Sequence, residues 1–120
     1  MEYLIVSNNA FVKAQYQSLQ FVEGDFYQVL IAARDRIHRG WRLVSHPLPA
    51  SIRMMYSPIR SIILAKESHS SATLLIEQSI DSYLRTMGQR QPDYRNLADY
   101  QTIDFELLQA CIADLTTNIE

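Results

Sequence analysis

The sequence is poor in cysteine, because Cys111 is the single one among its 120 residues. One thiol excludes an intramolecular disulfide and a metal site built from thiolates alone, so the expected location is a reducing cytoplasm. Histidine is also rare, and His38, His46 and His69 lack the spacing that zinc ligands have. We therefore expect neither a metal site nor a cofactor.

Glycine is equally scarce, with three residues at Gly24, Gly40 and Gly88. The phosphate loops of the Walker and dinucleotide-binding types need glycines close together, because the backbone must approach the phosphate there. Such spacing is missing, and this excludes a nucleotide site of either type. The Gly-x-Ser-x-Gly turn that holds the nucleophile of many hydrolases is missing as well.

Long apolar runs are also missing, since the longest has about five residues and a membrane span needs roughly 20. The initial segment MEYLIVSNN lacks the basic residues that open a signal peptide. The formal net charge of -2 argues against a partner that is a nucleic acid or an anionic membrane. We expect a single domain over residues 1–120 that binds neither of them.

The patterns that are present alternate between strand-like and helical segments. Strands are expected at 3–6, 19–22, 41–45 and 61–65, and helices at 11–17, at 25–37, from Ser70 or Ser71 to 87, and around 107–115. Asp25 and Gln28 predict a capping box at the start of the second helix. The strands are apolar without alternation, which is typical of parallel sheets covered on both faces. These patterns predict an α/β domain of three layers, with a small, mostly parallel sheet of about four strands flanked by helices.

The direction of the fourth strand depends on the connection that precedes it. A parallel crossover needs about a dozen residues or more, usually as a helix, and residues 49–60 barely reach that length. Pro49 is suited to opening a short helix that ends at Tyr56. If this helix does not form, an antiparallel fourth strand is expected.

Polar residues follow each predicted strand. They are Ser7, Asn8 and Asn9; Glu23 and Asp25; Ser45 and His46; and Lys66, Glu67 and Ser68. Ligands of open parallel sheets bind outside the carboxyl ends of the strands. Each residue taken singly is better explained as a strand end or a helix cap, but together they indicate a site for a small polar ligand.

His46 is the candidate catalytic residue, because an imidazole at a strand end can act as an acid, a base or an anion donor. Pro47 restricts the backbone of His46 to an extended conformation and so stiffens its orientation. The alternative is a histidine bonded to a neighbouring carbonyl group. Cys111 lies in the apolar stripe of the last helix, where packing in the core is expected.

The segment after His46 is basic and rich in hydroxyl groups. Arg53 and Arg60 lie among Ser51, Ser57 and Ser61, and such a set can bind a phosphate or carboxylate through charge-assisted hydrogen bonds. The alternative is a solvated basic loop. The adjacent residues 54–56 (Met-Met-Tyr) form either an exposed apolar patch or a contact beneath the loop.

Three segments of the sequence resemble the GrdX-like proteins. They are SNNAFVKAQY, FVEGDFYQVLIAARDRIHRGWRLVSHPLPASIR and SPIRSIILAKE, and the resemblance fades after Met87. Its most specific part runs from His46-Pro47 to Ser61, although Ala50 stands where a glycine is expected. The resemblance implies a link to the glycine, sarcosine and betaine reductase system, beside whose genes such proteins are typically encoded. It implies no particular activity.

The leading hypothesis is a non-catalytic accessory or regulatory protein of the glycine reductase system. It would bind a small anionic ligand or a partner protein at the strand-end edge, through Asn8, Asn9, His46, Ser51, Arg53, Ser57, Arg60 and Ser61. One alternative is a small transferase or hydrolase with His46 as its general base, and another is an interaction module using residues 54–56 and the final helix. The candidate partners are reductase components, phosphate or another small anion, and a second copy of the chain.

Overall fold

The computed structural model describes residues 2–66 and 72–118. The elements are β1 (Tyr3–Ser7), α1 (Ala10–Gln15), β2 (Leu19–Phe21), α2 (Phe26–Ile37), β3 (Trp41–Leu43), η1 (Ile52–Tyr56, a 3-10 helix), β4 (Ser61–Lys66), α3 (Ala72–Met87), η2 (Tyr94–Asn96, a 3-10 helix) and α4 (Leu97–Asn118). The α/β class and the four strands that the sequence predicts are confirmed. The predicted caps Ser70 and Ser71 lie outside the described residues.

The four strands form one mixed sheet in the order β2-β1-β4-β3. β1 is parallel to β2, whereas β4 is antiparallel to both β1 and β3. The prediction of a mostly parallel sheet is therefore wrong. The short helix η1 does form, but its five residues are too few to carry the chain back across a face of the sheet. The chain instead leaves the sheet after β3, turns through η1 and returns in the opposite direction.

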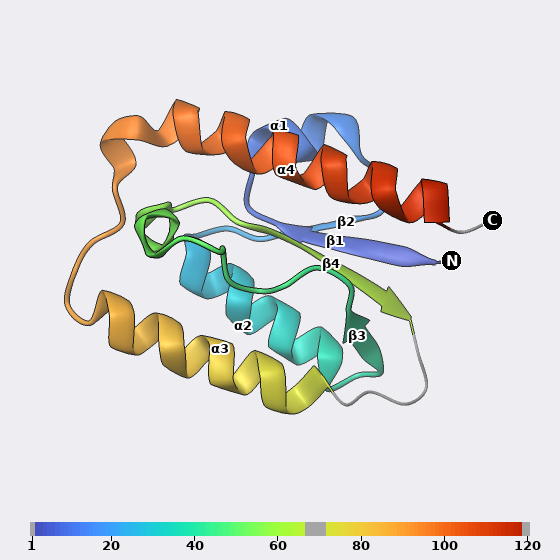
Figure 1. Cartoon of the computed structure of the whole chain (residues 1–120), viewed down its shortest axis with the longest axis horizontal. Coiled ribbons are helices and arrows are strands. Elements are labelled where there is room, and N and C mark those ends of the chain that lie inside the picture. The colour runs from blue at the N-terminus through green and yellow to red at the C-terminus, as the bar shows by residue number, and fades with distance from the viewer. Residues whose placement is uncertain (1, 67–71, 119–120) are drawn as a thin grey trace.

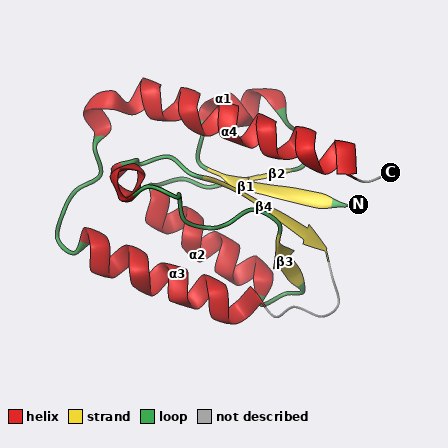
Figure 2. Cartoon of the chain, viewed as in Figure 1, coloured by secondary structure: helices red, strands yellow, loops and turns green. Residues whose placement is uncertain are grey.

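The strands are apolar without alternation because helices cover both faces of the sheet. Figure 1 shows α1 and α4 on one face and α2 and α3 on the other, and Figure 2 shows the sheet between these two helical layers. Ile62 and Leu64 point into the cluster beneath α2 and α3, while Ile63 joins the cluster beneath α1 and α4. Each such fully buried side chain contributes about 1.5–3 kcal/mol of hydrophobic stabilisation. Burial on both faces, and not parallel pairing, explains the pattern.

The start of α2 is held as its sequence predicts. The side chain of Asp25 accepts a hydrogen bond from the backbone N–H of Tyr27, and Gln28 Oε1 accepts from the N–H of Asp25 at 3.0 Å. The preceding Gly24 has φ +124°, and a Cβ atom there would lie 2.9 Å from the side chain of Gln28. Glycine is therefore required at this turn, both for the backbone conformation and for the space.

Because β1, β2 and β3 run in one direction, their carboxyl ends lie at one end of the sheet, and β4 begins there. Ser7 is paired with Ser61 in the register of β1 and β4, while Lys66 is paired with Trp41 at the opposite end. The expectation that Lys66 joins the strand-end residues is wrong, because β4 is antiparallel. Glu67 and Ser68 lie outside the described residues.

Two predictions about the later part of the chain are also corrected. The last helix was expected around 107–115, but α4 already begins at Leu97, so Asp104 lies inside the helix and is buried. Met55 is buried in the core under η1, which removes it from the apolar surface patch considered for residues 54–56.

In the described part of the chain, no helix is both long enough and apolar enough to cross a membrane.

Candidate functional site

Asn8 joins three segments that are distant in sequence. Its Nδ2 donates hydrogen bonds to the carbonyl oxygens of Gly24 (2.9 Å) and Pro58 (2.8 Å). Its Oδ1 accepts from the backbone N–H of Arg60 at 2.9 Å. Both amide protons of Asn8 are therefore used within the protein. This side chain holds the turns after β1 and before α2 against the entry to β4.

Asn9 has a similar role toward the last helix. It is the N-cap of α1, where its Oδ1 accepts from the N–H of Phe11. Its Nδ2 donates to the carbonyl oxygen of Gln101 at 2.9 Å and to Oδ2 of Asp104 at 3.0 Å. Asn9 is completely buried, and its two amide protons are directed at α4.

Asp104 is the centre of this buried network. Its Oδ1 accepts from the backbone N–H of Ser61 at 2.9 Å, and its Oδ2 accepts from the Ser61 hydroxyl at 2.6 Å. The hydroxyl groups of Ser61 and Ser7 are 2.7 Å apart, and Ser7 Oγ accepts from the N–H of Asn9. A continuous chain of hydrogen bonds thus runs from the turn after β1 to the carboxylate on α4. The place at the end of the sheet where a ligand was expected is occupied by the protein's own last helix.

Burial raises the pKa of Asp104, while hydrogen bonds from Ser61 and Asn9 and the charge of Arg60 oppose that shift. Arg60 is itself fastened to the main chain. Its Nε donates to the carbonyl oxygen of Pro47 at 3.0 Å, and its Nη2 donates to that of His46 at 2.6 Å. Burial lowers the pKa of Arg60, and the carboxylate of Asp104 opposes this. Arg60 therefore ties the segment after β3 to the start of β4.

His46 is exposed, and its ring lies against its own loop. Nδ1 is 3.0 Å from the backbone nitrogen of Leu48, which donates to it, and 3.1 Å from the Leu48 carbonyl oxygen. Nδ1 is therefore engaged with Leu48 of its own loop in either tautomer of the ring.

The two remaining serines of the predicted site form local contacts. Ser51 is the N-cap of η1 and accepts from the N–H of Arg53 at 3.2 Å. Ser57 Oγ is bonded to the N–H and the carbonyl oxygen of Ile59, both at 3.0 Å. The Ser51 hydroxyl therefore holds the start of η1, and the Ser57 hydroxyl shapes the turn between η1 and β4.

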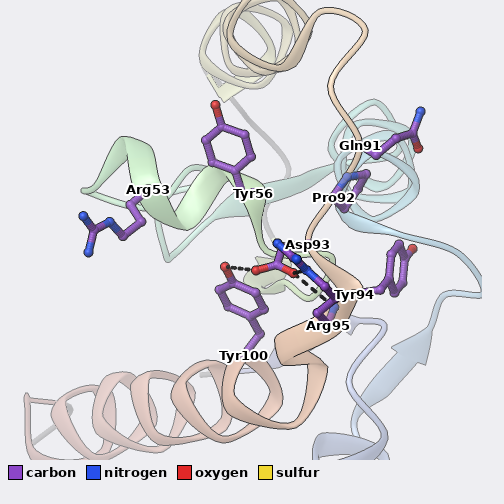
Figure 3. Close-up of a pocket in the computed structure, with 8 residues that line it drawn as sticks. All are labelled: Arg53, Tyr56, Gln91, Pro92, Asp93, Tyr94, Arg95 and Tyr100. Carbon is purple, nitrogen blue, oxygen red and sulfur yellow. Dashed lines mark hydrogen bonds and ion pairs between the residues drawn. The ribbon is translucent and has the colours of Figure 1, made fainter.

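A cavity lies beyond the same end of the sheet, and we refer to it as the tyrosine cleft. Its volume is about 650 Å³, and it is lined by Arg53, Tyr56, Gln91, Pro92, Asp93, Tyr94, Arg95 and Tyr100. Arg53 and Tyr56 extend from η1, the next five come from the connection between α3 and α4, and Tyr100 comes from α4 (Figure 3). The volume is in the range of sites for small molecules.

Asp93 gives the tyrosine cleft its shape. Its backbone N–H donates to the carbonyl oxygen of Tyr56 at 2.7 Å, which joins the α3–α4 connection to η1. Its carboxylate caps η2 and accepts from the N–H of Arg95 (3.0 Å), from Asn96 (2.9 Å) and from the Tyr100 hydroxyl (3.4 Å). Hydrogen bonds from Asn96 and Arg95 lower the pKa of Asp93. The floor of the cleft is thus a charged carboxylate whose position is fixed by these hydrogen bonds (Figure 3).

Two arginines place positive charge around this carboxylate. The Arg53 side chain is exposed, and its guanidinium has no hydrogen-bond or ion-pair partner among the residues that the structure describes. Arg95 is 94% exposed and approaches Asp93 only at 3.7 Å. Burial raises the pKa of Tyr100, and the charge of Arg53 acts in the opposite direction. Two guanidinium groups against one carboxylate leave the lining with one excess positive charge.

A second cavity, of about 70 Å³, lies between α4 and the start of β4. Its lining includes Ser45, Arg60, Asp104 and Cys111. At roughly 30 Å³ for each water molecule, it has room for water but not for a metabolite. Burial raises the pKa of the Cys111 thiol, and the side chain packs against the core as its sequence pattern predicts.

No group of three or more metal-ligating side chains occurs within residues 2–66 and 72–118.

The sequence model of the GrdX-like protein family matches residues 4–113. This chain belongs to the GrdX-like protein family. No match was found among curated proteins or among solved structures. The resemblance seen in the sequence is confirmed, but its end at Met87 is corrected, because the match continues into α4. The GrdX-like region therefore includes both sides of the tyrosine cleft.

The eight predicted ligand-binding residues of the GrdX-like chain divide into two groups. Seven of them have side chains already engaged within the protein or bonded to their own loop: Asn8, Asn9, His46, Ser51, Ser57, Arg60 and Ser61. Arg53 alone lines the cleft. No site was expected between the helix that ends at 87 and the one around 107–115, so the other cleft residues were missed. The cluster of Pro92, Asp93, Tyr94 and Arg95 was a local signal that could have singled out this segment.

Proposed function

We propose that this GrdX-like protein is a non-catalytic accessory or regulatory protein of the glycine reductase system, and that it binds a small anionic ligand in the tyrosine cleft. Family membership supports the association with glycine reductase, as the family name itself indicates. The observation that carries the ligand part is the guanidinium of Arg53, which lines the tyrosine cleft and has no partner among the described residues.

The cleft suits an anion better than the strand-end residues do. Arginine binds carboxylates and phosphates through charge-assisted hydrogen bonds, and a free guanidinium gives up no internal contact in doing so. Asn8 and Arg60, by contrast, would have to break hydrogen bonds that hold buried loops together. Arg95 adds a second donor to the lining of the cleft.

Isothermal titration of the full chain with inorganic phosphate tests the ligand part. We expect Arg53→Gln to weaken phosphate binding by about tenfold, the equivalent of roughly 1.4 kcal/mol. Arg85→Gln is the matched control, because Arg85 is exposed on α3 and pairs with Asp81. The ligand part fails if phosphate does not bind, or if the two variants bind it equally well.

Affinity capture with purified glycine reductase components tests the accessory role. The immobilised chain is expected to retain at least one of these components, and to release it in the presence of free chain. If none of the purified components is retained at micromolar concentrations, the proposed association is wrong, whatever the outcome of the phosphate titration.

A further inference from the structure

We infer that the tyrosine cleft takes an anion that carries a planar aromatic or heteroaromatic ring, of the kind represented by a purine nucleoside monophosphate. This inference rests on the proposed anion site at Arg53 and specifies the rest of the ligand. Its basis is the juxtaposition of three tyrosine rings, two guanidinium groups and one carboxylate around a single cavity.

Three of the seven tyrosines of the chain line this cleft. Tyr56 comes from η1, Tyr94 from η2 and Tyr100 from α4, so three separate elements contribute to the lining. In Figure 3, Tyr56 and Tyr100 lie on one side of Asp93 and Tyr94 lies on the other. Tyrosine offers a flat apolar face on which another ring can stack, together with a hydroxyl group that remains solvated. A cleft with such walls favours a planar ligand over an inorganic ion.

These rings are not used for aromatic packing inside the protein. The ring pairs of the described residues join Phe26 and Tyr27 to Tyr83, and Phe11 and Tyr16 to Phe105. None of them includes a cleft tyrosine. Tyr94 is 55% exposed, a large fraction for an aromatic side chain held at the start of a helix. No aromatic pair therefore covers the rings of the cleft, although Tyr56 also packs against the core cluster beneath α2 and α3.

The charges of the cleft agree with a ring that is joined to an anionic group. Arg53 supplies a guanidinium whose donors are free among the described residues, close enough for its charge to act on Tyr100. The carboxylate of Asp93 lies at the base and retains its charge because hydrogen bonds lower its pKa. A carboxylate there repels a second anionic group and attracts an N–H or NH2 group. The fitting ligand thus has its anion near the arginines and a hydrogen-bond donor on its ring.

A nucleotide site of this kind needs no glycine-rich loop. The Walker and dinucleotide motifs bind phosphates through backbone N–H groups, and the sequence lacks them. Here side-chain guanidinium groups would bind the phosphate and tyrosine rings would hold the base, as in proteins that stack bases on aromatic side chains. The missing motifs therefore exclude one way of binding a nucleotide and leave this one.

Titration calorimetry with three ligands tests the inference: adenosine 5′-monophosphate, adenosine and inorganic phosphate. We expect the monophosphate to bind the 120-residue chain at least about tenfold more tightly than either of its parts, adenosine and phosphate. Tyr100→Leu should weaken binding of the monophosphate about tenfold more than binding of phosphate. Tyr100→Phe keeps the ring and should retain most of the affinity. Circular dichroism melting curves establish that both variants are folded.

The possible failures are distinguishable from one another. If the monophosphate and phosphate bind with equal affinity, and Tyr100→Leu weakens both equally, the inference that the ligand carries an aromatic ring is wrong. The anion site at Arg53 would then still stand. Binding of adenosine alone, unaffected by Arg53→Gln, overturns the anion site proposed above and with it this inference. If none of the three ligands binds, both proposals are wrong.

Discussion

Asp104 accepts two hydrogen bonds from Ser61, which is 43 residues away in sequence. One comes from the backbone N–H of the first residue of β4, and the other comes from its hydroxyl group. α4 is thereby joined to the sheet at the point where β4 begins. The same carboxylate receives the amide of Asn9, so that one side chain holds the turn after β1, the entry to β4 and the last helix together.

Ser61→Ala should destabilise the protein by about 1–3 kcal/mol, because it removes the hydroxyl donor to buried Asp104 and the partner of Ser7. The measurement is urea unfolding followed by circular dichroism. Ser82→Ala, at a half-buried position on α3, serves as the control and should have an effect within about 0.5 kcal/mol. Equal effects of the two substitutions would show that the buried network contributes nothing particular to stability.

Asp104 should give the stability a distinct dependence on pH. Because burial raises its pKa above the ordinary value of 3.8, the folded protein binds this proton more tightly than the unfolded chain does. Its contribution to stability is therefore fully present below that value and is lost as the pH rises through the raised pKa. The free energy of unfolding of the wild type, minus that of Asp104→Asn, should fall as the pH rises above about 4. A difference that stays constant or grows over this range would contradict the raised pKa.

Gly24→Ala should be more damaging than Gly88→Ala. Gly24 has φ +124°, and a Cβ atom there would lie 2.9 Å from the Gln28 side chain, whereas Gly88 has φ +53° with nothing within 4 Å. The left-handed conformation at Gly88 costs alanine about 1–2 kcal/mol. Gly24→Ala adds a steric conflict inside the capping box, and its melting temperature should be the lower of the two. The reverse order would mean that the turn before α2 can rearrange.

His46→Ala should leave phosphate binding unchanged, because the ring is exposed and its Nδ1 is bonded to Leu48 within the same loop. The loss of that hydrogen bond at an exposed site should lower stability by about 0.5–1.5 kcal/mol. Titration calorimetry and urea unfolding provide the two measurements. A loss of phosphate affinity comparable to that of Arg53→Gln would return His46 to the binding site.

Much of the local structure could be predicted from neighbouring residues. The capping box of Asp25 and Gln28 depends on two residues three positions apart, and it is present as expected. The strands at 3–6 and 61–65 were located from their apolar runs, because a strand covered on both faces needs apolar side chains throughout. The inference of a parallel sheet failed for the same reason, since two helical layers produce this pattern whatever the strand direction.

The strand-end residues illustrate where such reasoning stops. The sequence correctly indicated that Asn8 and Asn9 end β1 near other polar groups, but it could not show what those groups bind. Asn8 meets Pro58 and Arg60, and Asn9 meets Asp104. Those partners are brought to the end of the sheet by the return of the chain through η1 and by α4, which are long-range events that no local pattern encodes.

The sequence by itself determined the α/β class, the positions of the strands and of α2, and membership of the GrdX-like family, because each depends on local periodicity, capping or a contiguous motif. Only the tertiary structure decided the direction of β4, the burial of Asp104 against Ser61, and the meeting of Arg53 with Tyr100 around one cleft. These features arise where distant segments pack. Their energies come from burying and pairing groups that are far apart in the chain, so they become visible once the chain is folded.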